Sequence, residues 1–208
     1  MTEQIGILGT GQMGIGLARC LSGAGYAVLL GSRDPSRAAA HAQALGGGVL
    51  PGGYADTVAG ATIVIPALGF ADMQALLAAL GPALAGKTVV DISTPWAEEI
   101  GEQSAAERHA ALLPDTARLV GAWKTTFAGL LDPAARAGVV HDVLISGDDR
   151  AANDRVAAII GATGFRPVDC GPLATARVVE GMVRLMGPIA RRLPPASGPR
   201  LPAWKFLP

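Results

Sequence analysis

The sequence predicts an α/β protein in which helices cover both faces of a doubly wound parallel sheet. Short apolar runs alternate along its 208 residues with windows rich in Ala and Leu, the alternation typical of strands and helices in such sheets. The apolar runs, such as residues 61–65 (ATIVI), are continuous rather than mixed with polar residues. Strands that are buried on both faces have this pattern. A hydrophobic content of 50% supplies one sizeable core.

The strands and helices are expected in alternating order. The expected strands are residues 5–8, 26–30, 61–65, 87–93, 117–123, 142–149 and 165–171. The expected helices are residues 12–24, 35–45, 70–80, 97–113, 149–164 and 173–190, with a Pro-rich tail after them. A shift in composition near residues 121–124 divides the chain into a nucleotide-binding domain, residues 1–122, and a smaller C-terminal α/β part, residues 123–208.

Charge and composition argue against several kinds of partner. The 17 basic and 17 acidic residues cancel, so neither a nucleic acid nor a membrane surface is expected to bind. The most apolar window, residues 61–86, is interrupted by Pro66 and Asp72, which argues against a membrane span. The two cysteines have no metal-site spacing, and no export signal is visible. We therefore expect a cytoplasmic protein without a metal site.

A glycine-rich loop follows the first expected strand. Residues 9–14 read G-T-G-Q-M-G, which places a G-x-G-x-x-G motif between a strand and a helix. In such motifs Gly9 would permit the tight turn, Gly11 would let a pyrophosphate approach the backbone, and Gly14 would let the helix pack closely against its strand. Free N–H groups at the start of the helix then bind the phosphates. The sequence thus predicts a dinucleotide-binding fold of the Rossmann type.

The end of the second expected strand distinguishes NADP from NAD. NAD enzymes usually carry Asp or Glu there, which accepts a hydrogen bond from the ribose 2′-hydroxyl. This chain carries Ser32 and Arg33, with Arg37 one helical turn further on, and guanidinium groups bind a 2′-phosphate. Asp34 precedes Pro35, a pair that favours a helix N-cap over a ribose contact. We therefore expect NADP(H).

No side chain stands out as a catalytic acid or base. His41 and His109 fall on polar helix faces and His141 precedes a strand, so all three are expected to be solvated. Reduction of a simple carbonyl needs a proton donor, because an alkoxide forms as the hydride arrives. Hydride transfer between two organic cofactors needs chiefly that the protein orients two rings and excludes water.

Several segments together resemble the NADPH:coenzyme F420 oxidoreductases, the 8-hydroxy-5-deazaflavin-dependent NADP reductases. The resemblance runs along nearly the whole chain. It rests on GTGQMGIGLA (9–18), GSRDPSR (31–37), VGAWKT (120–125), ISGDD (145–149), GFRPVDCGPLATARVVEGM (164–182) and KFL (205–207). The first two segments occur in many NADP-binding proteins, and the later ones are more specific to this family.

The resemblance implies which residues contact each substrate. The family's NADP contacts correspond to Thr10, Gln12, Met13, Ser32, Arg33 and Arg37, in addition to the three motif glycines. Ile65 and Pro66 correspond to the strand end beside the nicotinamide. The family's deazaflavin cleft corresponds to residues 122–125, which include Trp123, Lys124 and Thr125.

The chain departs from the family at Lys124, where archetypal members carry His. Lys124 could donate to a ring carbonyl or pair with the acidic tail of the deazaflavin, or it could be a surface lysine. Trp96 and Trp123 could stack on a planar ring or pack in the core. These positions leave the hydride acceptor open.

The function expected from the residues and the resemblance is hydride transfer between NADP(H) and the deazaflavin coenzyme F420. One alternative is NADPH-dependent reduction of another acceptor, such as a flavin, an imine or a ferric complex. A second is an NADP(H)-sensing protein without turnover. We also expect a homodimer, in which the apolar helix near residues 178–189 and the Pro-rich tail cover the partner.

Overall fold

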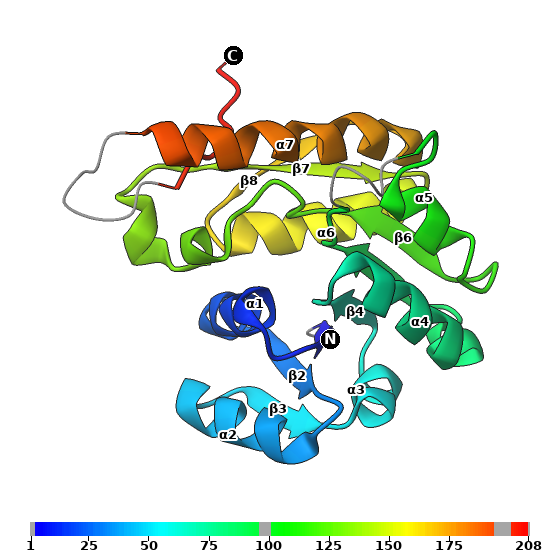
Figure 1. The fold of residues 1–208 in the computed structure, drawn as a ribbon. Helices are drawn as coiled ribbons and strands as arrows, with labels where there is room; N and C mark the ends of the chain where they lie inside the picture. Colours follow the sequence, from blue (N-terminus) through cyan, green and yellow to red (C-terminus); the bar gives the residue numbers. More distant parts are fainter. Residues whose placement is uncertain (1–2, 96–100, 194–200, 208) are drawn as a thin grey trace.

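The computed structural model describes residues 3–95, 101–193 and 201–207, and its centre is one eight-stranded sheet (Figure 1). The strands follow the order β3-β2-β1-β4-β5-β6-β7-β8. They are β1 (Gln4–Leu8), β2 (Ala27–Gly31), β3 (Val49–Gly52), β4 (Ile63–Pro66), β5 (Thr88–Asp91), β6 (Arg118–Gly121), β7 (Asp142–Gly147) and β8 (Arg166–Asp169). All neighbouring pairs are parallel except β6 and β7, which are antiparallel. The predicted α/β class with a doubly wound sheet is confirmed, and the sheet departs from the predicted parallel arrangement between β6 and β7.

The helices lie on both faces of this sheet (Figure 1). They are α1 (Gln12–Gly23), α2 (Pro35–Leu45), α3 (Tyr54–Gly60), α4 (Phe70–Leu80), α5 (Ala105–Ala110), α6 (Arg150–Ala162) and α7 (Ala176–Arg192). Short 3-10 helices are η1 (Gly81–Leu84), η3 (Ala128–Leu131), η4 (Pro133–Arg136) and η5 (Leu173–Thr175). Within the described ranges, no helix is both long and apolar enough for a membrane crossing.

Successive strand residues pack into different cores. In β4, Ile63 and Ile65 pack with residues of α1, α2 and α6, whereas Val64 packs with residues of α3 and α4. A third cluster joins β6 to α5, η5 and α7. The strands are therefore buried on both faces, which explains why their sequences are continuously apolar.

The order of the first six strands places one crevice at the carboxyl edge of the sheet. The chain passes from β1 outward to β3 and then returns to β4 on the other side of β1. At such a reversal the loops after β1 and β4 diverge, and ligands of doubly wound sheets bind between them. The glycine-rich loop follows β1, so it lies at this point.

Three elements differ from the sequence prediction. The strand β3 and the helix α3 were not expected, and α5 is shorter than the helix expected there. Residues 49–52 (VLPG) contain Pro and Gly, both unfavourable in strands, and they form an edge strand that pairs only with β2. The helix expected at residues 97–113 is present as Ala105–Ala110, and residues 96–100 lie outside the described ranges. The division of the chain into two parts at residue 122 stays a prediction. The strands on either side of it, β6 and β7, pair with each other in the sheet.

Candidate active site

The loop after β1 adopts the conformation that its glycines were predicted to allow. Gly9 has a φ of 124°, and a Cβ there would lie 2.6 Å from the carbonyl oxygen of Ala67. A Cβ on Gly14 would lie 2.1 Å from the Gly9 carbonyl oxygen. Both positions therefore exclude any larger residue, because the loop packs directly against α1 and the segment after β4.

Gly11 has a different environment, which fits a bound pyrophosphate. A Cβ on Gly11 would meet no atom within 4 Å, so open space lies beside its backbone. Gly11 is also the N-cap of α1, which has no capping side chain and no acidic residue in its first turn. The N–H groups at this end are thus left for an anionic ligand, which the helix dipole also favours.

The predicted 2′-phosphate residues lie at the carboxyl end of β2. Ser32 is buried, and its hydroxyl accepts a hydrogen bond from the backbone of Asp34 at 3.2 Å. Arg33 and Arg37 are exposed, and in the described part of the chain neither guanidinium makes a hydrogen bond or ion pair. Both are thus available to a phosphate.

Asp34 caps α2, as its position before Pro35 predicted. Its carboxylate accepts hydrogen bonds from the backbone N–H of Ser36 at 3.0 Å and from the Ser36 hydroxyl at 2.6 Å. These bonds lower the pKa of Asp34 below its ordinary value. The carboxylate that an NAD enzyme would direct at a ribose is here engaged by its own helix.

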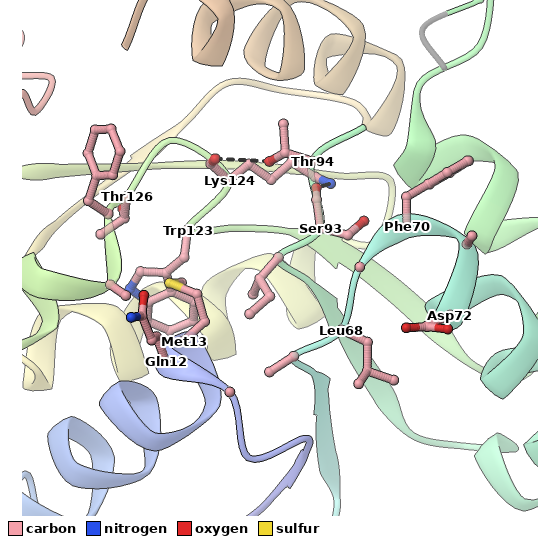
Figure 2. A pocket seen from close by; sticks show the side chains of 17 residues that line it. Gln12, Met13, Leu68, Phe70, Asp72, Ser93, Thr94, Trp123, Lys124 and Thr126 are labelled. Atoms are coloured by element: carbon pink, nitrogen blue, oxygen red, sulfur yellow. Dashed lines mark hydrogen bonds between the residues drawn. The ribbon is translucent and has the colours of Figure 1, made fainter. Parts of the chain in front are cut away.

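A cavity of about 840 Å³ extends from the glycine-rich loop along the carboxyl ends of β4, β5 and β6 (Figure 2). The loop contributes Gly11, Gln12 and Met13. The segments after the three strands contribute most of the remaining wall, which comprises Ala67, Leu68, Gly69, Phe70, Ala71, Asp72, Ile92, Ser93, Thr94, Trp123, Lys124, Thr126, Phe127 and Ala128. Ile65 and Pro66 end β4 directly before this wall and are buried.

Lys124 is buried in the cavity wall rather than extended into the cavity. Its ammonium lies 2.9 Å from Asp91 Oδ2, 3.0 Å from Glu180 Oε1 and 2.7 Å from the Ser93 carbonyl oxygen. An ammonium has three protons, and these three acceptors occupy all of them. The sequence showed the lysine but not its partners, because Asp91 and Glu180 are 33 residues before it and 56 residues after it in the chain.

Asp91 also accepts from His109, at 3.1 Å between Oδ2 and Nδ1. Burial of Asp91 opposes its ionisation, but attraction to Lys124 and the bond from His109 hold its pKa below the ordinary value. His109 is completely buried, so the expectation that it is solvated is wrong. The helix face that carries it packs against the end of β5 and the Phe70 ring, 5.1 Å away.

Glu180 connects this cluster to two helices. It lies on α7, and it accepts from the backbone N–H groups of Ala105 and Ala106 at 2.8 and 3.1 Å. These N–H groups begin α5 and would otherwise lack partners. Asp91, His109, Lys124 and Glu180 thus form one buried polar cluster, which ties β5, α5, α7 and the loop after β6 together.

Trp123 lies in the cavity wall beside Lys124 and has an unusual backbone. Its side chain is buried, and its φ is 50°, a region that residues other than glycine rarely adopt. Among the residues that the structure describes, its indole nitrogen has no hydrogen-bond partner, and neither has the hydroxyl of Ser93 on the other side of the cavity. Thr125 is buried and does not line the cavity, whereas its neighbour Thr126 does. Trp96 lies outside the described residues.

Comparison with known proteins bears on both the fold and the family. A family model described as "NADP oxidoreductase coenzyme F420-dependent" matches residues 4–95. The F420-dependent NADP reductase of Methanothermobacter marburgensis is 32% identical over 204 residues, which cover 86% of this chain and 88% of that protein. The metalloreductase STEAP3 of Rattus norvegicus is 35% identical over 97% of this chain, and the match spans 38% of its own length.

A solved structure is similar over nearly the whole chain. It is the crystal structure of a candidate F420-dependent NADP reductase from Arthrobacter sp. FB24, with 31% sequence identity and a TM-score of 0.80. The similarity covers 92% of this chain and 94% of that one.

Proposed function

This chain belongs to the family of coenzyme F420-dependent NADP oxidoreductases, and from that premise we propose that it transfers a hydride between NADP(H) and coenzyme F420. The observation that carries the proposal is the cavity of about 840 Å³, which begins at the glycine-rich loop and continues past the ends of β4, β5 and β6. Sites for small organic ligands have volumes of roughly 300–1,000 Å³. This one has room for a nicotinamide and a second ring system beside it.

NADP(H) binds along the carboxyl edge in this proposal. The N–H groups at the start of α1 hold the pyrophosphate beside Gly11, with Thr10, Gln12 and Met13 around it. Ser32, Arg33 and Arg37 hold the 2′-phosphate. Ile65 and Pro66 at the end of β4 support the nicotinamide side of the cavity.

The chain's own contribution to the reaction is orientation and exclusion of water. Bound NADPH supplies the hydride, and coenzyme F420 accepts it at its deazaflavin ring. The cavity wall is largely apolar, with Leu68, Phe70 and Ile92 among its side chains, so it favours ring stacking and keeps out water. Lys124 contributes by fixing the loop after β6, since its ammonium protons are already bonded to the protein. Trp123 presents its ring in the same wall.

A second candidate is reduction of another acceptor by NADPH. The similarity to a metalloreductase, at 35% identity over 97% of this chain, favours a metal complex as that acceptor. The absence of a histidine at position 124 is a further point in its favour. Among the described residues, no group of three or more His, Cys, Asp or Glu is placed to hold a metal ion. In this second candidate the metal complex is a substrate that binds in the same cavity.

We also propose a cytoplasmic homodimer. Val178, Leu185 and Ile189 leave apolar side chains exposed along α7, which a partner's surface would cover. Part of the C-terminal segment packs on its own chain instead of covering a partner, because the backbone groups of Trp204 and Phe206 are hydrogen-bonded to Asp142.

An acceptor panel tests the proposed function. The protein is mixed with NADPH and, separately, with oxidised coenzyme F420, a flavin, an imine and a ferric complex. Loss of the deazaflavin absorption band with NADPH oxidation supports the proposal. NADPH oxidation with only another acceptor supports the second candidate. Tight NADPH binding without oxidation by any acceptor indicates a sensing protein.

A further inference from the structure

Trp123 carries a buried hydrogen-bond donor without a partner in the wall of the cavity. Its side chain is 1% exposed, and its Nε1 atom makes no hydrogen bond within residues 3–95, 101–193 and 201–207. A buried N–H group without a partner destabilises a protein, and folded proteins keep few of them. An unpartnered donor is therefore informative when it lies in the wall of a ligand cavity, because a ligand atom can satisfy it.

The backbone holds this side chain in a strained conformation. A φ of 50° is unfavourable for tryptophan and persists only where neighbouring contacts enforce it. Here the neighbour is Lys124, whose ammonium is bound to Asp91, Ser93 and Glu180. The Lys124 carbonyl also accepts from the Thr94 hydroxyl at 3.1 Å (Figure 2). The indole is thus fixed before any ligand enters.

The position of the ring relates it to the nucleotide loop. Figure 2 shows the indole on the side of the cavity that carries Gln12 and Met13, which begin α1. Met13 packs against the core cluster to which Trp123 belongs. The indole therefore lies in the wall of the same cavity in which the proposed function places the nicotinamide and the acceptor ring.

We propose that the indole N–H of Trp123 donates a hydrogen bond to the polar edge of the molecule that accepts the hydride. This inference rests on the proposed function, with coenzyme F420 as that acceptor. Hydride addition forms a C–H bond at C5 of the deazaflavin and moves an electron pair toward its N1–C2 carbonyl edge. NADPH becomes NADP⁺, a proton from water completes the reduced deazaflavin, and the indole keeps its own proton throughout.

A fixed donor at this edge helps the transfer more than it helps binding. The acceptor edge gains negative charge as the hydride arrives, so the hydrogen bond strengthens toward the transition state. Two other donors near the wall are already engaged, whereas the Ser93 hydroxyl on the other side of the cavity has no partner among the described residues. Lys124 uses its three protons within the buried cluster, and His109 Nδ1 is bonded to Asp91.

The test compares Trp123→Phe with Trp204→Phe. Phenylalanine keeps an aromatic ring and removes the N–H group. Trp204 is a matched control, because its Nε1 is also buried without a partner in the described part of the chain but the residue does not line the cavity. Each variant loses an unsatisfied donor but also buried ring volume, so both are expected to unfold at a somewhat lower urea concentration than the unchanged protein and to be folded under assay conditions.

Only Trp123→Phe is expected to change the reaction with coenzyme F420. We expect kcat to fall about 10- to 100-fold, with KM for NADPH unchanged. The Kd for oxidised coenzyme F420 is measured by its fluorescence without NADPH. We expect this Kd to rise by a factor that is several times smaller than the factor by which kcat falls. Trp204→Phe should alter none of these values.

Equal behaviour of the two variants would overturn the inference, while F420 reduction by the unchanged protein would leave the proposed function intact. A rise of KM for NADPH alone in Trp123→Phe would also overturn it, because the indole would then contact the dinucleotide. If the unchanged protein reduces only another acceptor, the proposed function is wrong, and the inference for coenzyme F420 is wrong with it.

Discussion

Lys124 Nζ lies 2.9 Å from Asp91 Oδ2, and neither side chain is exposed to solvent. Glu180 completes the arrangement from α7, so one ammonium balances two buried carboxylates beside the cavity. Such groups contribute little as net attraction, because burying each charge is costly, but removing one partner leaves the others uncompensated. The cluster therefore fixes how the loop after β6 lies against β5.

The first prediction concerns the stability of this cluster. Lys124→Met should lower the free energy of unfolding by about 3–5 kcal/mol, because it leaves two buried carboxylates without their cation. Urea unfolding followed by circular dichroism measures the change. Lys205→Met is the control, since Lys205 is exposed and donates to the Val140 carbonyl, a neutral acceptor. Equal effects of the two substitutions would show that Lys124 is not part of a buried charge cluster.

The second prediction concerns acid stability. Arg177 donates two hydrogen bonds to the Glu107 carboxylate, and the backbone N–H and hydroxyl of Ser104 donate two more, which together lower the pKa of Glu107 from 4.5 to about 2. A carboxyl group whose pKa is lower in the folded protein than in the unfolded protein stabilises the fold at pH values above its unfolded-state pKa. That contribution is lost as the pH falls from about 4.5 toward 2.

Glu107→Gln tests this dependence. Urea midpoints measured from pH 6 to pH 2 should fall less steeply in the variant than in the unchanged protein. Asp115→Asn is the control, at an exposed position in the turn before β6. Parallel curves for all three proteins would contradict the assigned role of the Glu107–Arg177 pair.

The third prediction separates two glycines of the nucleotide loop. Gly11→Ala should leave the unfolding midpoint nearly unchanged, because open space surrounds the position, yet it should weaken NADPH binding by tenfold or more. Gly14→Ala should destabilise the fold itself, since its Cβ would lie 2.1 Å from a carbonyl oxygen. Thermal unfolding and fluorescence titration with NADPH distinguish these effects. Unchanged NADPH affinity in Gly11→Ala would place the pyrophosphate elsewhere.

The fourth prediction concerns the choice of dinucleotide. Arg33→Ala should weaken NADP⁺ binding by about 10- to 100-fold and NAD⁺ binding much less, because a charged hydrogen bond to the 2′-phosphate is lost. Arg150→Ala, on the exposed surface of α6, should change neither affinity. Calorimetric titration gives both constants. Equal losses for the two dinucleotides would contradict a 2′-phosphate site at Arg33.

Much of the nucleotide-binding half could be predicted because its signals are local. The G-x-G-x-x-G spacing fixes a strand, a turn and a helix within a few residues, and Asp34 before Pro35 marks the start of α2. The edge strand β3 escaped prediction because residues 49–52 carry Pro and Gly where strands usually carry β-branched residues.

The site beyond the nucleotide loop could be predicted only in part. The resemblance drew attention to Trp123 and Lys124, and both line the cavity. Their partners come from distant elements, so the burial of Lys124, Asp91 and His109 had no local signal. A lysine or histidine on a polar segment is predicted to be solvated when the carboxylates that pair with it in the fold lie far away in the sequence.

The most direct test of the proposed function follows the hydride itself. NADPH deuterated at nicotinamide C4, as each stereoisomer in turn, is mixed with the protein and oxidised coenzyme F420, and the reduced product is analysed by mass spectrometry and NMR. We predict that one stereoisomer transfers its deuterium to C5 of the deazaflavin with a primary isotope effect on the rate. Reduction without label at C5, or no reduction of coenzyme F420 while another acceptor is reduced, would contradict direct hydride transfer between these two rings.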